Sequence, residues 1–107
     1  PMGGMGNANN MIRQAQKMQK DMAALQEELD AKEYTVNAGG GMATVTINGK
    51  KEVLSIDIKP EIVDPDDIET LQDILVAAVN EAIKTVETTN SEEMQKITGP
   101  IGMPGLF

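Results

Sequence analysis

Apolar residues along the first third of the chain recur at the spacing of a helix. Successive apolar positions are 4, 3, 4, 3 and 4 residues apart, which is a sustained heptad pattern. These positions are Met11, Ala15, Met18, Met22, Leu25 and Leu29. Because Asn9 or Asn10 can cap the first turn, the pattern predicts a helix over about residues 9–31, with a length on the order of 30 Å.

Apolar and polar residues then alternate, which is the period of a strand with one buried face. Three such runs occupy residues 34–38, 42–48 and 53–59. The glycines at 39–41 indicate a turn, and Asn48-Gly49 is a strong hairpin signal because both positions of its turn adopt positive φ. The alternation predicts a three-stranded antiparallel meander with one apolar face. The residues expected on that face are Tyr34, Val36, Ala38, Ala43, Val45, Ile47, Leu54, Ile56 and Ile58.

Helical spacing returns over residues 68–86, where a wide apolar stripe predicts a second long helix. Asp64 suits the N-cap of this helix and Pro65 its first turn. Residues 88–91 (TTNS) are poor helix formers and good caps, so we expect a kink or break there and then a short helix to about Ile97. The predicted element order is α-β-β-β-α(-α), an α+β fold.

The chain length suits one small domain, which we expect over residues 9–98. Residues 1–8 are mostly Gly, Met and Asn and should form a disordered N-terminal tail. Gly99-Pro100 should end the last helix and leave residues 99–107 as a flexible C-terminal tail.

Both predicted long helices exceed the length of a six-residue strand, which is about 20 Å. In a single chain they would overhang the sheet, and their apolar faces would meet water. A homodimer, in which sheets or helices pair across a two-fold axis, is the simplest way to cover them.

Cations and acids are separated along the chain. The formal net charge is −8, yet residues 1–20 hold three cations and no acid, so the rest of the chain holds six cations against 17 acids, a net of −11. Arg13, Lys17 and Lys20 are spaced i, i+4 and i+7 and therefore share one helix face. Such a row on a rigid helix can contact phosphates. The alternative is a solvated helix face on which Lys17 pairs with Asp21.

Composition argues against catalysis. The chain has no cysteine and no histidine, which removes thiolate chemistry and the commonest general base and metal ligand, and which fits a reducing cytoplasm. Ser55 and Ser91 lie in no nucleophile motif, and Gly49-Lys50 does not complete a phosphate-binding loop because Thr44 stands where glycine is required. We therefore expect no enzyme activity, no cofactor, no bound metal and no small-molecule substrate.

Base stacking and membrane association are also disfavoured. The only aromatic residues are Tyr34 and Phe107, so unpaired bases would have almost no rings on which to stack. No apolar run reaches 18 residues, and the first ten residues lack the features of a signal peptide. We therefore expect no contact with a membrane.

Several segments occur in a specific order along residues 9–104, and the most specific is GGGMATVTINGK at 39–50. The others are Met11 with QAQKMQ (14–19), Glu27-Glu28, the set Val53, Ile56, Ile58 and Pro60, DDIETLQDILVAAVNEAIK (66–84), and Met94 with Thr98-Gly99. In this order they resemble the YbaB/EbfC family of bacterial nucleoid-associated proteins.

The resemblance implies a tweezer-like homodimer with paired sheets and protruding helices. It implies binding of double-stranded DNA, with little or variable sequence preference, in the cytoplasm and at the nucleoid, in a chromosome-organising or regulatory role. In this family, contact with DNA is attributed to the first helix and the C-terminal helix. Carried over to this chain, the DNA-binding residues are Arg13, Lys17, Lys20, Lys84 and Lys96.

Two other functions remain open. A protein-interaction module would grip a partner protein with exposed methionine-rich helix ends, through Met11, Met18 and Met22, although methionine at this spacing is more often core. RNA binding is the other. The salt dependence of affinity separates DNA binding from the protein-interaction module. Six phosphate-contacting cations per dimer predict a log–log slope of affinity against salt near −5, at about 0.9 per contact. A contact made by methionines would respond little.

Overall fold

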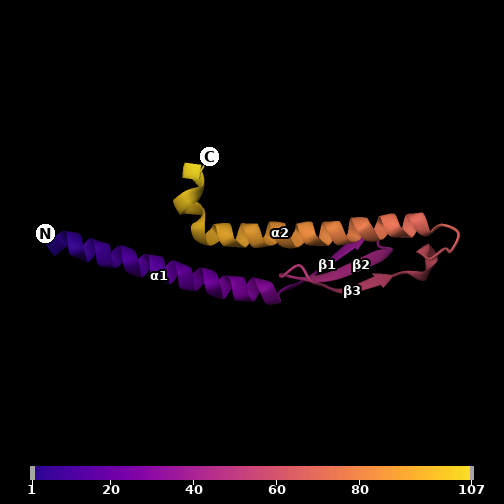
Figure 1. Cartoon of the computed structure of the whole chain (residues 1–107), viewed down its shortest axis with the longest axis horizontal. Coiled ribbons are helices and arrows are strands. Elements are labelled where there is room, and N and C mark those ends of the chain that lie inside the picture. The colour runs from indigo at the N-terminus through magenta and orange to yellow at the C-terminus, as the bar shows by residue number, and fades with distance from the viewer. Residues whose placement is uncertain (1, 107) are drawn as a thin grey trace.

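The computed structural model describes the backbone of residues 2–106 and the side chains of residues 8–97. The elements are α1 (Met2–Ala31), β1 (Glu33–Ala38), β2 (Ala43–Asn48), β3 (Val53–Ile58), the short 3-10 helix η1 (Pro60–Ile62) and α2 (Ile68–Leu106). The molecule is elongated, 80 × 28 × 15 Å: α1 points away from the sheet, and α2 crosses the sheet and continues beside α1 (Figure 1). The predicted α+β class is confirmed.

The sheet is the predicted antiparallel meander, in the order β1-β2-β3. Its register aligns Val36 with Val45 and Val45 with Ile56, so one face is apolar. Between β2 and β3 the register shifts, because Thr46 pairs with Ser55 while Ile47 pairs with Val53. Leu54 is the extra residue of this bulge, so Val53 rather than the expected Leu54 lies opposite Ile47.

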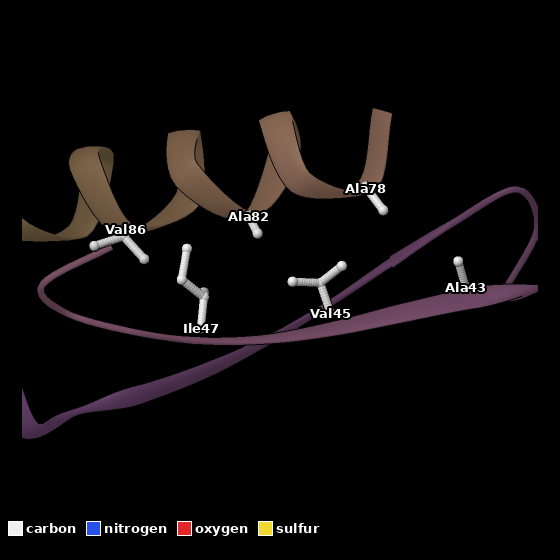
Figure 2. Close-up of a cluster of buried hydrophobic side chains, with 6 residues drawn as sticks. All are labelled: Ala43, Val45, Ile47, Ala78, Ala82 and Val86. Atoms are coloured by element: carbon white, nitrogen blue, oxygen red, sulfur yellow. The ribbon is translucent and has the colours of Figure 1, made fainter. Parts of the chain in front are cut away.

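The core lies between β2 and α2. Figure 2 shows three α2 side chains that point toward three β2 side chains, and all six are fully buried. They are Ala43, Val45 and Ile47 of β2 and Ala78, Ala82 and Val86 of α2. The α2 residues are four apart and therefore share one helix face. Alanine at 78 and 82 lets the helix lie close to the sheet.

Ile47→Ala is expected to lower the free energy of unfolding by about 2–5 kcal/mol, because it removes a fully buried side chain from this core. Urea denaturation at one protein concentration measures the change. The matched control is Val76→Ala on α2, where the side chain is 61% exposed and the expected change is within about 0.5 kcal/mol. Equal effects of the two substitutions would contradict this account of the core.

The predicted burial of β3 is wrong for the single chain. Leu54, Ile56 and Ile58 are 50%, 41% and 36% exposed, and Val53 is 41% exposed. The physical reason is the width of the covering layer. One helix is about 10 Å across and strands lie about 4.8 Å apart, so α2 covers β1 and β2 and leaves β3 uncovered.

The predicted kink at residues 88–91 is also wrong, since α2 is one continuous helix through this segment. One of its polar side chains, Asn90, bonds to another part of the chain instead of ending the helix. Asn90 is half-buried and donates from Nδ2 to the carbonyl oxygen of Gly49 at 3.2 Å. That long-range contact offsets the low helix propensity of the segment.

The N-cap of α2 is Asp67 rather than the predicted Asp64. Asp64 instead organises a turn before the helix: its side chain accepts from the Asp66 N–H at 2.9 Å, and its carbonyl accepts from the Asp67 N–H at 2.9 Å. Asp67 Oδ1 then accepts from the backbone N–H of Thr70 at 3.3 Å, three residues into the helix. Because of this turn, the N-cap lies three residues later than predicted.

The hairpin after β2 differs from the predicted two-residue turn. Four residues, 49–52, join β2 to β3, and the positive φ of 66° lies at Lys51 instead of Asn48 or Gly49. The turn at residues 39–41 is confirmed, with positive φ at all three glycines. Both hairpins therefore form at the predicted glycines, but Gly49 of the second hairpin does not adopt a positive φ.

Both helices extend past their predicted ends, since α1 begins at Met2 and α2 ends at Leu106. The predicted tails, residues 1–8 and 99–107, lie almost wholly outside the described side chains, so their predicted flexibility and the domain limits at 9 and 98 stay predictions. Within the part of the chain that the structure describes, no helix combines the length and apolar character needed to cross a membrane.

Candidate nucleic-acid interface

A cationic stripe on α1, formed by Arg13, Lys17 and Lys20, is exposed to solvent. The stripe lies beyond the sheet, on the part of α1 that points away from the body of the molecule (Figure 1). It spans eight residues, about 10 Å of helix from the first to the last. No acid precedes Asp21 in the sequence, so the stripe's positive field is not cancelled on its N-terminal side.

The predicted alternative partner of Lys17 is present but weak. Lys17 Nζ lies 3.9 Å from Asp21 Oδ2, at the limit of an ion pair, and the two side chains are 80% and 52% exposed. Exposed i,i+4 pairs are typically worth about 0.3–0.5 kcal/mol. Lys17 can therefore leave Asp21 for a phosphate at small cost.

The structure brings Lys96 toward this stripe. A hollow between the helices is lined by Gln14, Lys17, Met18 and Asp21 of α1 and by Ile97 of α2. The turn of α2 that carries Lys96 therefore lies beside the stripe. The Lys96 ammonium is 3.1 Å from a carboxylate oxygen of Glu93, so it shares its charge with an acid one turn earlier.

Lys84 is not brought to the stripe. It lies 12 residues before Lys96, about 18 Å along α2, on the part of the helix that crosses the sheet. It lines a shallow hollow with Glu81 and three threonines of α2. Of the two α2 cations predicted as DNA-binding residues, only Lys96 thus lies near the cations of α1.

The opposite end of the molecule is acidic. Residues 60–73 carry six acids and no cation, and they form η1 and the start of α2, at the end far from the N-terminus (Figure 1). The molecule therefore carries the cationic stripe, with Glu92 and Glu93 of α2 near it, toward one end of its 80 Å axis and an acidic cluster at the other end. A polyanion is attracted to the first and repelled by the second.

Two residues of the loop between β2 and β3 make contacts with the helices that the sequence did not indicate. Lys51 forms an ion pair with Glu87 of α2 at 3.1 Å, and Gly49 lies against the end of α1, where a Cβ atom would overlap the carbonyl oxygen of Leu29. The Asn48-Gly49 signal identified a turn. Nothing in the local sequence showed which elements would pack against it.

These features define a class of small, elongated α+β proteins in which a three-stranded meander carries two long helices, one of them with a cationic end. The chain belongs to the YbaB/EbfC DNA-binding family, whose model matches residues 5–101. The resemblance seen in the sequence is thereby confirmed.

Individual relatives support the same family assignment. A nucleoid-associated protein of Clostridium novyi is 55% identical over 106 residues, which cover 99% of this chain and 93% of the relative. One of Alkaliphilus metalliredigens is 58% identical over the same length, with the same coverage. The crystal structure of an uncharacterized protein from Helicobacter pylori matches with a TM-score of 0.66 at 28% identity, over 78% of this chain and 87% of that one.

Proposed function

We propose that this protein binds double-stranded DNA as a homodimer, through the cationic stripe of α1, and acts at the bacterial nucleoid in the cytoplasm as a chromosome-organising or regulatory protein. The observation that carries the proposal is the exposed stripe on a helix that is free of acids up to Asp21, in a chain whose remainder has a net charge of −11. Membership of a DNA-binding family and the names of the relatives support it.

The chemistry of the stripe favours contact with the DNA backbone. Its charges are point cations on a rigid helix, and the one aromatic side chain among the described residues, Tyr34, packs at the core's edge. Phosphate contacts supply affinity and orientation but carry no sequence information. The protein should therefore bind many sequences, with Lys96 adding charge beside the stripe and Lys84 making a separate, weaker contact.

A second copy of this chain is the partner that β3 fits. The strand has one unpaired edge, and its apolar side chains Val53, Leu54, Ile56 and Ile58 are all exposed. An exposed apolar edge strand invites pairing with another strand. Pairing two copies through β3 would satisfy the unpaired backbone edge, would bring the apolar side chains of the two strands together, and would double the stripe from three cations to six.

One observation favours the alternative of a protein-interaction module. Met11 and Ile12 are 69% and 54% exposed, near the end of α1 that carries the stripe. Exposed methionine is common at adaptable protein-binding surfaces. Such a contact would bury apolar area instead of neutralising phosphates, and this difference separates the two functions experimentally.

The test is a fluorescence-anisotropy titration of labelled duplex DNA at 50 mM and 200 mM salt. Six phosphate contacts per dimer predict a slope near −5, so the affinity should fall by about a thousand-fold between the two conditions. An absence of binding at low salt, or binding that hardly changes with salt, would overturn the proposed DNA interface and favour the protein partner. A single-stranded RNA competitor of equal length tests the remaining class of ligand.

A further inference from the structure

The loop between β2 and β3 contacts the end of α1. The Gly49 N–H donates to the carbonyl oxygen of Lys32 at 2.9 Å, one residue past the C-terminus of α1. The Lys32 N–H in turn donates to the carbonyl oxygen of Leu29 at 3.2 Å. A Cβ atom at Gly49 would overlap that same oxygen. The last turn of α1 is therefore held against the loop at a distance that only glycine permits.

The same loop contacts α2 on its other side. The carbonyl oxygen of Gly49 accepts from Asn90 Nδ2 at 3.2 Å, and Lys51 Nζ donates to Glu87 Oε2 at 3.1 Å. Glu87 and Asn90 are three residues apart and share one face of α2. Gly49 thus joins both long helices through its two backbone groups, and Lys51 adds an ion pair to one of them.

The loop is fixed by its own hydrogen bonds. Asn48 Oδ1 accepts from the backbone N–H of Lys50 at 2.9 Å and of Glu52 at 3.0 Å, and Asn48 Nδ2 donates to the Glu52 carboxylate at 2.8 Å. The backbone N–H of Lys51 also donates to the carbonyl oxygen of Asn48 at 3.0 Å. These hydrogen bonds restrain the shape of the loop that contacts both helices.

Small rotations at this loop become large movements at the stripe. Sixteen residues, about 24 Å of helix, separate Leu29 from Arg13. A change of about 10° in the direction of α1 would therefore move Arg13 by about 4 Å, which exceeds the length of a hydrogen bond. Farther out, α1 and α2 line one hollow beside Lys17 and Ile97, so a change of this angle would also change the spacing of the two helices there.

We propose that the loop of residues 49–52 sets the angle between α1 and α2 and so positions the cationic stripe on DNA. Gly49, Lys51 and Glu87 are positioning residues: they act through the direction of α1 and make no contact with DNA themselves. The proposal rests on the proposed DNA-binding function and names the part of the structure that gives the interface its geometry.

The sign of the effect at Glu87 separates positioning from simple electrostatics. Glu87→Gln removes a negative charge and, by charge alone, should strengthen binding to DNA. Because it also breaks the ion pair with Lys51, we expect about two- to five-fold weaker binding. The matched control is Glu92→Gln, which removes the same charge from an exposed position on α2 and should bind equally or slightly more tightly.

Gly49→Ala should have the larger effect, about ten-fold weaker binding or more, because its Cβ atom displaces the end of α1. Gly40→Ala is its control: it adds the same methyl group to the other hairpin, where no atom lies within 4 Å, and the backbone strain of alanine at its φ of 68° falls outside the loop of residues 49–52. If Gly49→Ala fails to fold, Glu87→Gln still tests the proposal, because its site is more than half exposed.

The angle itself is measured by electron paramagnetic resonance. The chain has no cysteine, so spin labels at Gln16→Cys and Gln95→Cys report the separation of the helices in labelled protein diluted into unlabelled protein. We expect a shifted or broadened distance distribution in Gly49→Ala and Glu87→Gln, together with weaker DNA binding. An unchanged distribution, or a changed one with unchanged DNA binding, would overturn the proposal.

Failure of the proposed DNA-binding function would give a different result from failure of the proposal about the loop. If the unmodified protein shows no salt-dependent DNA binding, the DNA-binding function fails, and with it the claim that the loop positions a DNA interface. The label distances would then still show whether the loop sets the angle between α1 and α2.

Discussion

Replacement of Arg13, Lys17 and Lys20 together by alanine is expected to abolish DNA binding and to leave the proposed dimer intact. The three side chains are exposed, so their removal disturbs no packing, and alanine is the best helix former. A dimer would lose all six of the stripe's cations. We expect affinity at 50 mM salt to fall by at least about 100-fold, with little salt dependence left. Anisotropy titration measures affinity, and light scattering measures the mass of the particle.

A matched triple variant controls for total charge. Lys32, Lys50 and Lys59 are also exposed, and their replacement by alanine gives the same net charge of −11, three below the −8 of the unmodified chain. Lys32 and Lys50 make their loop hydrogen bonds with backbone groups, which alanine keeps. This control should bind DNA nearly as well as the unmodified protein. Equal losses in both variants would show that overall charge, instead of the stripe, governs binding.

Ile56→Lys is expected to convert the proposed dimer to a monomer. Ile56 is 41% exposed in the single chain, so a monomer accepts lysine there, whereas a paired β3 would have to bury the ammonium among apolar side chains. Burial of an unpaired charge costs several kcal/mol. Light scattering should give a mass near the 11.5 kDa of one chain instead of twice that value. With three cations per particle, the salt slope should fall from about −5 to about −3.

Ser55→Lys is the control for this variant. Ser55 is the neighbouring residue of β3 and lies on the polar face of the sheet, opposite the face of Ile56. The same charge on this face should leave the dimer intact. A dimer that survives Ile56→Lys would show that the two copies meet through another surface.

The cations of the candidate site could be found from the sequence, because the separation of Arg13, Lys17 and Lys20 from the acids is a property of the chain itself. The residues that lie near these cations in space could not be found from the sequence. Lys84 and Lys96 look alike in sequence, yet only the turn of Lys96 lies beside α1. Lys51 reads as a surface charge at a turn and is instead paired with Glu87, 36 residues away.

The sequence by itself determined the helices, the three strands and their order, because heptad spacing and two-residue alternation are local patterns that need no partner to be recognised. Tertiary structure alone decided three further features. α2 leaves β3 exposed, since one helix spans only two strands; α2 continues through residues 88–91, since Asn90 bonds to Gly49; and Gly49 joins two helices. Each depends on contacts between segments far apart in the chain, and a local pattern contains no information about them.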